Sequence, residues 1–329
     1  MNAVITGVGM YVPEKTLTNF DLEKMVDTSN EWIIERSGIE VRHITAQDEY
    51  CSDMASKAAA AAIENANLSP TDIDMILVTT ITPDMMTPSA SCVVQKNIGA
   101  INAVAMDLNA ACTGFIYGLV TGESFIKSSG YKHILVIGSE TLSKVTDYKD
   151  RGTCVLFGDG AGAVVLSATQ EDYGIRSRVL GADGTKGDVL TLLNLKSTEE
   201  ELEKRLSKNP ATIYMDGSEV FKFAVRTMVS ATMQALEQAN ITTDDLDLLI
   251  PHQANVRILD GAAKRLKLPQ GRVMNNIKDY ANMSSASVPV ALCAALKQNR
   301  IKDGDNIVMC GFGGGLTWAA VAMKWKEIK

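Results

Sequence analysis

The apolar and polar positions of the chain follow the same order twice. Residues 62–77 have the pattern of an amphipathic helix end, a polar turn and a buried strand. Residues 235–250 repeat that pattern 173 positions later, counted from residue 62 to residue 235, and the apolar run 133–138 corresponds to 306–311 at the same offset. A constant offset across separate segments indicates a duplicated unit.

The repeat predicts both the fold class and the division of the chain. Helix and strand patterns alternate within each copy, so we expect an α/β protein of two duplicated βα halves. The polar stretch 168–174 separates the copies, which places the halves at residues 1–170 and 171–329. In such a pair of halves the strand ends can face one shared crevice, where ligands commonly bind.

The composition indicates which partners and which cellular compartment to expect. Of the 329 residues 46% are hydrophobic and 22% are charged, which is ordinary for a soluble globular protein. A formal net charge of −7 without any Lys/Arg run argues against a protein that binds nucleic acid. No apolar run reaches about 18 residues and no leader pattern opens the chain, so we expect neither a membrane partner nor secretion. The six cysteines lack CxxC spacing, which predicts a cytoplasmic protein without a disulfide framework or a metal site.

Cys112 is the first candidate for chemistry. It follows the strand-like run 103–108 and a few small residues, and a helical pattern begins directly after it. The free N–H groups and partial positive charge of a helix N-terminus favour a thiolate there. A small buried apolar side chain is the more common role of a free cysteine. At the repeat offset Cys112 corresponds to Ser285, so only the first half offers a thiol.

Polar groups of the second half also fall at predicted strand ends. His252 follows Pro251 on a stiff strand exit, although a histidine there could equally be a core or capping residue. Asn282 precedes a helical pattern and could donate a hydrogen bond to a developing charge, or serve as an N-cap. The glycines at 313–315 follow a strand, where their N–H groups can form an anion-binding nest.

Together these segments resemble the thiolase-fold condensing enzymes, and most closely the 3-oxoacyl-[acyl-carrier-protein] synthase III family. The resemblance extends over nearly the whole chain and implies a thiolase-like fold in which the two halves form a layered αβαβα sandwich. The set Cys112, His252 and Asn282 is typical of this family. The elongating synthases are similar in fold but have a Cys–His–His set. Further matching segments are 27–33, 36–39, 156–162 and 219–222.

The resemblance implies an acyltransferase that performs a decarboxylative Claisen condensation. Cys112 would accept the acyl group of an acyl-CoA primer. A malonyl group on acyl carrier protein (ACP) would then lose CO2 and attack the acyl-enzyme, giving 3-oxoacyl-ACP and initiating fatty-acid synthesis. His252 and Asn282 would donate hydrogen bonds to the malonyl thioester oxygen, and the N–H groups of Cys112 and Gly314 would form an oxyanion hole. No cofactor is implied, because acyl-CoA is a substrate.

The resemblance also implies binding surfaces and a homodimer. The residues implied for CoA are Trp32, Arg36, Arg151 and Arg257. The residues implied for contact with the acidic carrier protein are Lys222, Arg257, Lys264 and Arg265. A local basic patch on a chain of net charge −7 is compatible with electrostatic steering of an acidic partner.

The chain departs from the family pattern around the implied acyl pocket. Thr87 stands where relatives commonly have a Phe that closes this pocket across the dimer interface, and Phe157 is the other implied pocket residue. The loss of a ring favours a longer, branched or polar primer over acetyl. Ala281 replaces the Gly before Asn282, and it would be strained by about 1 kcal/mol if that position has a positive φ.

The segment 186–212 looks longer than in compact relatives. Residues 197–206 predict a short added helix with a Thr198–Glu201 capping box. Glu200 with Lys204, and Glu201 with Arg205, have the spacing of ion pairs on a helix. This part of the fold borders the acyl pocket in relatives and could therefore tune the substrate, but we favour its interpretation as a solvated surface excursion.

Three other functions fit parts of the pattern. The first is a synthase-III-like enzyme of a specialised pathway that uses an unusual primer, which the change at Thr87 keeps open. The second is a cysteine hydrolase of thioesters built on Cys112 and His252, although Asn282 and Gly314 favour condensation. The third is a catalytically silent acyl-CoA-binding protein, against which the intact Cys, His and Asn argue.

Overall fold

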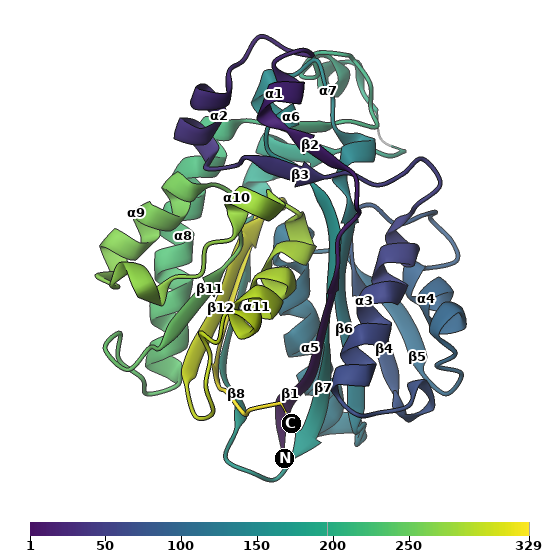
Figure 1. The fold of residues 1–329 in the computed structure, drawn as a ribbon, viewed down its shortest axis with the longest axis vertical. Helices are drawn as coiled ribbons and strands as arrows, with labels where there is room; N and C mark the ends of the chain where they lie inside the picture. Colours follow the sequence, from purple (N-terminus) through teal and green to yellow (C-terminus); the bar gives the residue numbers. More distant parts are fainter. Residues whose placement is uncertain (196, 329) are drawn as a thin grey trace.

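Two β-sheets that enclose a pair of central helices organise the molecule, as the computed structural model in Figure 1 shows. It describes residues 1–195 and 197–328. Lys196, in the predicted excursion, and Lys329, at the end of the predicted second half, lie outside the described residues.

The first sheet has five strands in the order β1-β7-β6-β4-β5. β4 runs parallel to β5 and β6, whereas β7 is antiparallel to both β6 and β1. All five positions of β4 are buried, as expected for a strand covered on both faces. The strands are β1 (Asn2–Tyr11), β4 (Met75–Thr79), β5 (Val104–Leu108), β6 (His133–Thr141) and β7 (Asp159–Thr169).

The second sheet has the order β11-β12-β13-β8 and matches the first strand for strand, except that no described strand corresponds to β5. Its strands are β8 (Gly174–Ala182), β11 (Leu248–Pro251), β12 (Asn306–Gly313) and β13 (Thr317–Lys324). The chain leaves the first sheet at Thr169 and enters the second at Gly174, around the polar stretch expected between the halves.

Backbone turns recur at the offset of 173 as well. Ala111 and Ser284 both adopt a positive φ, of 47° and 45°, and each opens a short 3-10 helix. Asn67 and Asn240 have φ values of 54° and 55°. These pairs of matching turns support the duplication that the apolar pattern predicts.

Helices complete the predicted αβαβα layering. α5 (Gly114–Ser129) and α11 (Ser287–Lys297) contact both sheets and form the middle layer. α3 (Cys51–Asn65) and α4 (Ala90–Ile98) cover the outer face of the first sheet. α8 (Gly217–Gln238) and α9 (Val256–Leu266) cover the second. The first nine positions of α11 are buried, which is typical of a helix enclosed on all sides.

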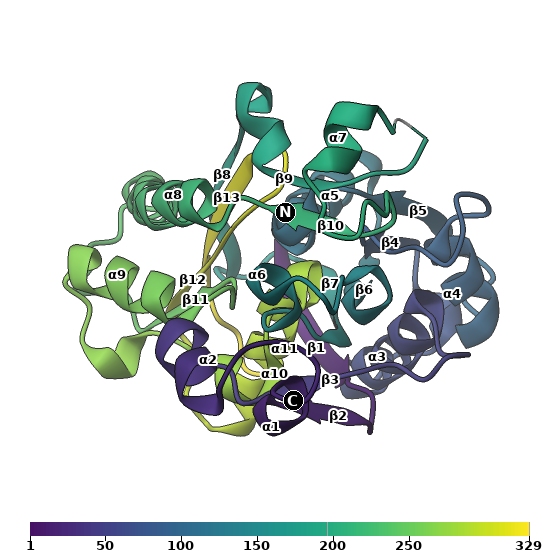
Figure 2. The same cartoon turned by 90° about the horizontal axis from the view of Figure 1, so that it is seen from above.

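Short elements form a cap over the carboxyl ends of the parallel strands, as Figure 1 shows at the top and Figure 2 shows from above. They are α1 (Asn19–Leu22), α2 (Asn30–Ser37), α6 (Arg151–Cys154), α7 (Glu199–Glu203), α10 (Ile277–Tyr280), β2 (Thr16–Thr18), β3 (Val41–His43), β9 (Leu190–Leu192) and β10 (Ile213–Met215). The 3-10 helices of the chain are Pro70–Asp72, Ala111–Thr113, Leu142–Val145, Gly184–Val189, Gln270–Arg272 and Ser284–Ala286. Within the two described ranges no helix is long and apolar enough to cross a bilayer.

The segment 186–212 is part of this cap. Its helix α7 is the predicted one, and the Thr198 hydroxyl accepts a hydrogen bond from the Glu201 N–H. The predicted pair of Lys204 with Glu200 is wrong, because Lys204 instead pairs with Glu201 at 3.1 Å. Arg205 also pairs with Glu201, at 3.6 Å, and its guanidinium is buried against backbone carbonyls. The interpretation as a solvated excursion is therefore wrong for residues 190–193, which line the cavity, and for the buried Arg205, whereas α7 has no buried residue and lies on the surface.

Candidate active site

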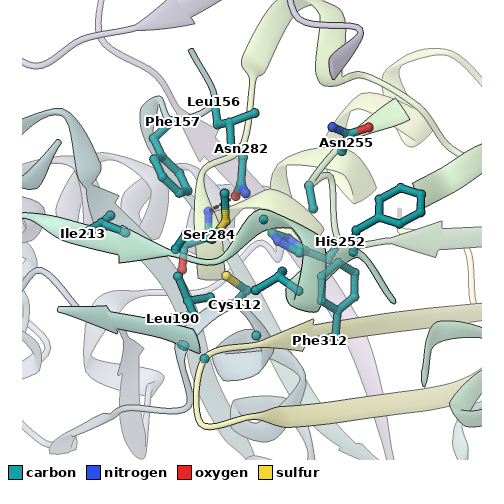
Figure 3. A pocket seen from close by; sticks show the side chains of 18 of the residues that line it. Cys112, Leu156, Phe157, Leu190, Ile213, His252, Asn255, Asn282, Ser284 and Phe312 are labelled. Atoms are coloured by element: carbon teal, nitrogen blue, oxygen red, sulfur yellow. Dashed lines mark hydrogen bonds between the residues drawn. The ribbon is translucent and has the colours of Figure 1, made fainter. Parts of the chain in front are cut away.

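A cavity of about 1120 Å³ lies under the cap, where strand ends of both halves meet. Figure 3 shows Cys112, His252 and Asn282 around one space, with Phe157, Leu190 and Ile213 on one side and Phe312 on the other. The sequence-predicted residues in its wall are Trp32, Arg36, Cys112, Phe157, Lys222, His252, Arg257, Asn282 and Gly314.

Cys112 lies in the 3-10 helix Ala111–Thr113, directly before α5. The glycine turn after β12 packs closely on its backbone, since a Cβ at position 313 would lie 2.7 Å from the Cys112 nitrogen. The Thr113 and Thr317 hydroxyls are 2.9 Å apart, and the Thr317 hydroxyl also lies 3.1 Å from the Gly314 carbonyl. The nucleophile turn and the glycine turn are thus joined by side-chain hydrogen bonds.

The ionisation of Cys112 differs from the sequence prediction. Burial raises the pKa of its thiol to about 12, while the Ser284 hydroxyl lowers this pKa and the Glu140 carboxylate raises it further. A helix start supplies only a partial charge, which does not compensate for the loss of water around a thiolate. Burial therefore opposes the thiolate that the helix start favours.

His252 is held rigidly at the end of β11. Its backbone N–H donates to the Cys310 carbonyl at 2.8 Å, and its ring meets that of Phe312 edge to face with centroids 5.4 Å apart. Burial lowers the pKa of His252 to about 3, so the imidazole is neutral at physiological pH. Its Nδ1 atom has no hydrogen-bond partner within the part of the chain that the structure describes. A neutral imidazole can donate one hydrogen bond without bringing a positive charge.

Asn282 is fixed through both its backbone and its side chain. Its N–H donates to the Leu156 carbonyl, and its carbonyl accepts from the Gly158 N–H, each at 3.0 Å. The side-chain Oδ1 accepts from the Ser284 N–H at 2.9 Å. Because a backbone N–H can only donate, the carboxamide orientation is determined and the Nδ2 donor is left for the cavity.

The residue before Asn282 has the backbone that the family pattern implies. Ala281 has φ 58° and ψ −162°, a region that is almost restricted to glycine. The expected strain at this position is thus present, and its buried methyl group packs with Ile39 and Ile277.

Three of the four residues implied for CoA binding, Trp32, Arg36 and Arg257, line the cavity. The guanidinium groups of Arg36 and Arg151 lie 5.9 Å and 4.9 Å from the centre of the Trp32 ring. Arg151 is not in the cavity wall and donates to the Asp27 carbonyl. Arg257 lies over the Phe221 ring at 5.7 Å.

The other implied binding residues lie outside or at the rim of the cavity. Lys222 is in the wall and pairs with Glu219 at 2.8 Å, whereas Lys264 and Arg265 lie in the last turn of α9 and outside the wall. Thr87 is exposed and does not line the cavity of its own chain.

Sequence reasoning missed a large part of the wall. The strands β9 and β10 contribute apolar side chains beside Phe157, among them Leu190, Leu192 and Ile213. The mostly apolar stretch 190–193 was the sequence signal that could have indicated this part of the wall. Ser284 in the wall and the buried Glu140 next to it were missed too, because polar residues in apolar surroundings carry no pattern of their own.

Models of one family match both halves of the chain. The model for 3-oxoacyl-[acyl-carrier-protein (ACP)] synthase III matches residues 106–184, and the model for its C terminal matches residues 236–325.

Individual relatives match along almost the whole length. The chain is 52% identical to beta-ketoacyl-[acyl-carrier-protein] synthase III of Caldanaerobacter subterraneus subsp. tengcongensis, over 99% of this chain and 98% of the relative. It is 52% identical to the protein of the same name from Geobacillus kaustophilus, over 99% of both chains. The crystal structure of 3-oxoacyl-[acyl-carrier-protein] synthase III from Aquifex aeolicus superposes with a TM-score of 0.92 at 44% identity, over 98% of this chain and 100% of that one. With this identity over its whole length, the chain belongs to the 3-oxoacyl-[acyl-carrier-protein] synthase III family.

Proposed function

We propose that this acyltransferase condenses an acyl-CoA primer with malonyl-ACP to give 3-oxoacyl-ACP, CO2 and CoA, and so initiates fatty-acid synthesis. The observation that carries the proposal is the position of Cys112, His252 and Asn282 around one cavity, with the imidazole neutral and one Asn282 donor free. A nucleophile beside two uncharged donors suits a reaction that passes through an acyl-enzyme and an enolate.

The first stage transfers the acyl group to Cys112. The Cys112 sulfur attacks the thioester carbonyl, the bond from that carbonyl to the CoA sulfur breaks, and the thiol proton leaves with the CoA thiol. We propose that the N–H groups of Cys112 and Gly314 stabilise the oxyanion, and the close approach of Gly313 to the Cys112 nitrogen supports this. The Thr113–Thr317 contact keeps these two turns in register.

The second stage forms the carbon–carbon bond. As the malonyl group loses CO2, negative charge develops on its thioester oxygen, where His252 and Asn282 donate hydrogen bonds. Donors that are fixed before the reaction need no reorganisation when the charge appears. The resulting carbanion attacks the acyl carbonyl, the bond from that carbonyl to the Cys112 sulfur breaks, and the departing Cys112 thiolate takes up one proton from water to regenerate the thiol.

The cavity wall indicates the kind of primer. Leu190, Leu192, Ile213 and Phe157 surround the space beside Cys112 with apolar surface. We propose a primer longer than acetyl or branched, because added methylene groups gain about 0.8 kcal/mol each when buried.

The binding partners follow from the rim of the cavity. We propose that the adenine ring of CoA stacks on Trp32, with Arg36, Arg151 and Arg257 near its phosphates. Lys222, Arg257, Lys264 and Arg265 form the basic surface for the carrier protein. The six cysteines are unpaired thiols, which suits a reducing compartment such as the cytoplasm.

We further propose a homodimer formed through β5. This strand is at the edge of the first sheet, and Val104 at its start is 51% exposed. The exposed Met85, Met86 and Thr87 would then reach the partner's acyl pocket. Light scattering should give a dimer for the wild type and a monomer for Val104→Lys; a monomeric wild type would contradict this arrangement.

Intact mass spectrometry after incubation with mixed acyl-CoAs tests the central proposal. Wild-type protein should gain one acyl group, with branched or medium-length groups loaded faster than acetyl, and Cys112→Ser should gain none. Added malonyl-ACP should convert the acyl group into 3-oxoacyl-ACP. Acylation of Cys112→Ser would overturn the mechanism, and release of free acid without condensation would identify a thioester hydrolase instead.

A further inference from the structure

Asn109 directly follows β5 and lies in the cavity wall, yet it has no part in the chemistry described so far. Its side-chain Oδ1 accepts a hydrogen bond from the Ala111 N–H at 3.3 Å. Because a backbone N–H can only donate, this contact determines which carboxamide atom faces the turn. Asn109 is thus bound to the turn that carries Cys112.

The same contact occurs in the second half, at the offset of 173. There the Asn282 Oδ1 accepts from the Ser284 N–H at 2.9 Å. The residue two positions after each asparagine has a positive φ, 47° at Ala111 and 45° at Ser284. Each of these residues then opens a 3-10 helix that leads into a helix of the middle layer. The asparagine and the positive φ therefore occur together in both copies of the unit.

The backbone of Ala111 explains why a side-chain contact is needed here. A residue other than glycine is rarely found at this φ, because its Cβ comes too close to the backbone. Asparagine stabilises such turns when its side chain bonds to the backbone two residues further on. The hydrogen bond to Asn109 therefore offsets the unfavourable conformation of Ala111. Ala111 also packs on the glycine turn, since a Cβ at Gly314 would lie 3.6 Å from the Ala111 Cβ.

The turn determines where the Cys112 N–H lies. Its direction depends on the backbone of Ala111, because the two residues share one planar peptide unit. Among the described residues no other residue accepts a hydrogen bond from this N–H, whereas the corresponding Ser285 N–H donates to the Glu140 carboxyl group at 3.4 Å. A Cβ at Gly313 would lie 2.7 Å from the Cys112 nitrogen. A free N–H held beside the glycine turn suits the stabilisation of an oxyanion.

We propose that Asn109 is a positioning residue for acyl transfer: its Oδ1 holds Ala111 at a positive φ and thereby directs the Cys112 N–H at the thioester oxygen. In that step the Cys112 sulfur bonds to the thioester carbon, and the carbonyl oxygen gains a negative charge. The charge is lost when the bond from this carbon to the CoA sulfur breaks, and the thiol proton leaves with CoA. Asn109 itself exchanges no proton. This inference rests on the proposed function, because it assigns a further residue to that reaction.

The test is the single-turnover loading of Cys112 from isobutyryl-CoA and from acetyl-CoA, followed by intact mass spectrometry. Asn109→Ala should lower the rate at saturating acyl-CoA by about three- to tenfold, the loss expected for one hydrogen bond. The half-saturating concentration should stay within about twofold of wild type, because uniform binding of the substrate is unchanged. The double variant Asn109→Ala, Ala111→Gly should load within about twofold of the wild-type rate, because glycine adopts a positive φ without help.

Three controls separate positioning from a general structural defect. Alkylation of Cys112 by iodoacetamide forms no oxyanion, so its rate in Asn109→Ala should stay within about twofold of wild type. Asn109→Ser should load faster than Asn109→Ala, because a hydroxyl forms the same turn more weakly. Asn102→Ala is the matched variant and should load as wild type does. Asn102 is an exposed asparagine before β5, and its Nδ2 donates to the Thr71 carbonyl at 3.0 Å.

The outcomes that contradict this role differ from those that contradict the function. A wild type that loads, together with an Asn109→Ala variant of equal rate, would overturn the role of Asn109 alone. A slow Asn109→Ala variant that Ala111→Gly does not restore would overturn it too. If Asn109→Ala does not fold, failure of Ala111→Gly to restore folding has the same meaning. A wild type that takes up neither acyl group would overturn the proposed function together with this role.

Discussion

At the residue scale, burial rather than local sequence determines the ionisation of the reactive groups. The Cys112 thiol has a pKa raised to about 12, and the His252 imidazole has a pKa lowered to about 3. In both cases loss of water favours the neutral form. Burial therefore opposes a thiolate–imidazolium pair, and a neutral imidazole leaves His252 able to donate one hydrogen bond.

The buried His252 predicts a loss of stability in acid. Its pKa is 6.5 for the ordinary group and about 3 in the folded protein. Below pH 6.5 the unfolded chain therefore binds a proton that the folded protein does not, and stability falls until the pH reaches about 3. Denaturant unfolding of wild type and His252→Gln between pH 7 and pH 4.5 should differ in average slope by about 1 kcal/mol per pH unit. Parallel slopes for the two proteins would show that His252 is not buried in its neutral form.

The positive φ of Ala281 predicts that a smaller residue is tolerated at this position and a larger one is not. Ala281→Gly should change the free energy of unfolding by less than about 1 kcal/mol. Relief of about 1–3 kcal/mol of backbone strain is offset by the lost methyl burial, about 0.8 kcal/mol, and by the greater freedom of unfolded glycine.

Ala281→Val should destabilise by about 2 kcal/mol or more, since a branched side chain at this φ meets the packed neighbours Ile39 and Ile277. Thermal unfolding of both variants measures the difference. Equal melting temperatures for the two variants would contradict the strained geometry.

At the element scale, the decisive unit is the segment that carries β9, α7 and β10. Its local signals predicted the helix α7 and its Thr198 cap. They did not predict that β9 and β10 line the cavity, since the pairing of Leu190–Leu192 with Ile213–Met215 joins residues more than twenty positions apart. Arg205 holds the unit together through the Thr191 hydroxyl at 2.7 Å and the Thr212 carbonyl at 3.1 Å.

Arg205→Lys is expected to loosen this segment, because an ammonium group cannot replace the planar fork of the guanidinium. Protease cleavage between α7 and β10 should be about tenfold faster, and the KM for the acyl primer should rise while far-UV circular dichroism is unchanged. Lys204→Ala is the control, since Lys204 makes only one partly exposed ion pair with Glu201. Equal cleavage of the two variants would show that Arg205 does not anchor the segment.

At the scale of the whole molecule, charge is distributed unevenly. The chain has a net charge of −7, yet the two adjacent helices α8 and α9 carry Lys222, Arg257, Lys264 and Arg265, of which Lys222 and Arg257 line the cavity. Lys264 and Arg265 follow the cavity wall residue Arg257 by about two helical turns, so they can meet a protein without touching a ligand in the cavity.

The double variant Lys264→Gln, Arg265→Gln should affect the use of malonyl-ACP without affecting the use of acyl-CoA. The KM for malonyl-ACP should increase by about three- to tenfold at low salt, and the difference from wild type should shrink at high salt as the charges are screened. Loading of Cys112 from acyl-CoA should change by less than about twofold. A carrier-protein KM equal to that of wild type at low salt would place the docking surface elsewhere.

The sequence by itself determined the repeated architecture and most of the residues that meet in the cavity. The offset of 173 reappears in the sheet order and even in the φ values of Ala111 and Ser284, because duplicated apolar patterns fold into duplicated strands and turns. Cys112 follows β5 and His252 follows β11, and strand ends of both halves face the cavity, whereas Asn282 reaches it from the loop after α10.

Only the tertiary structure decided the state of those groups and their surroundings. The raised pKa of Cys112 comes first from burial, which depends on cavity walls drawn from both halves of the chain. The apolar wall comes from β9 and β10, and the orientation of Asn282 comes from Ser284. Burial and contacts between distant segments arise from packing in three dimensions, and no local pattern of apolar and polar residues records them.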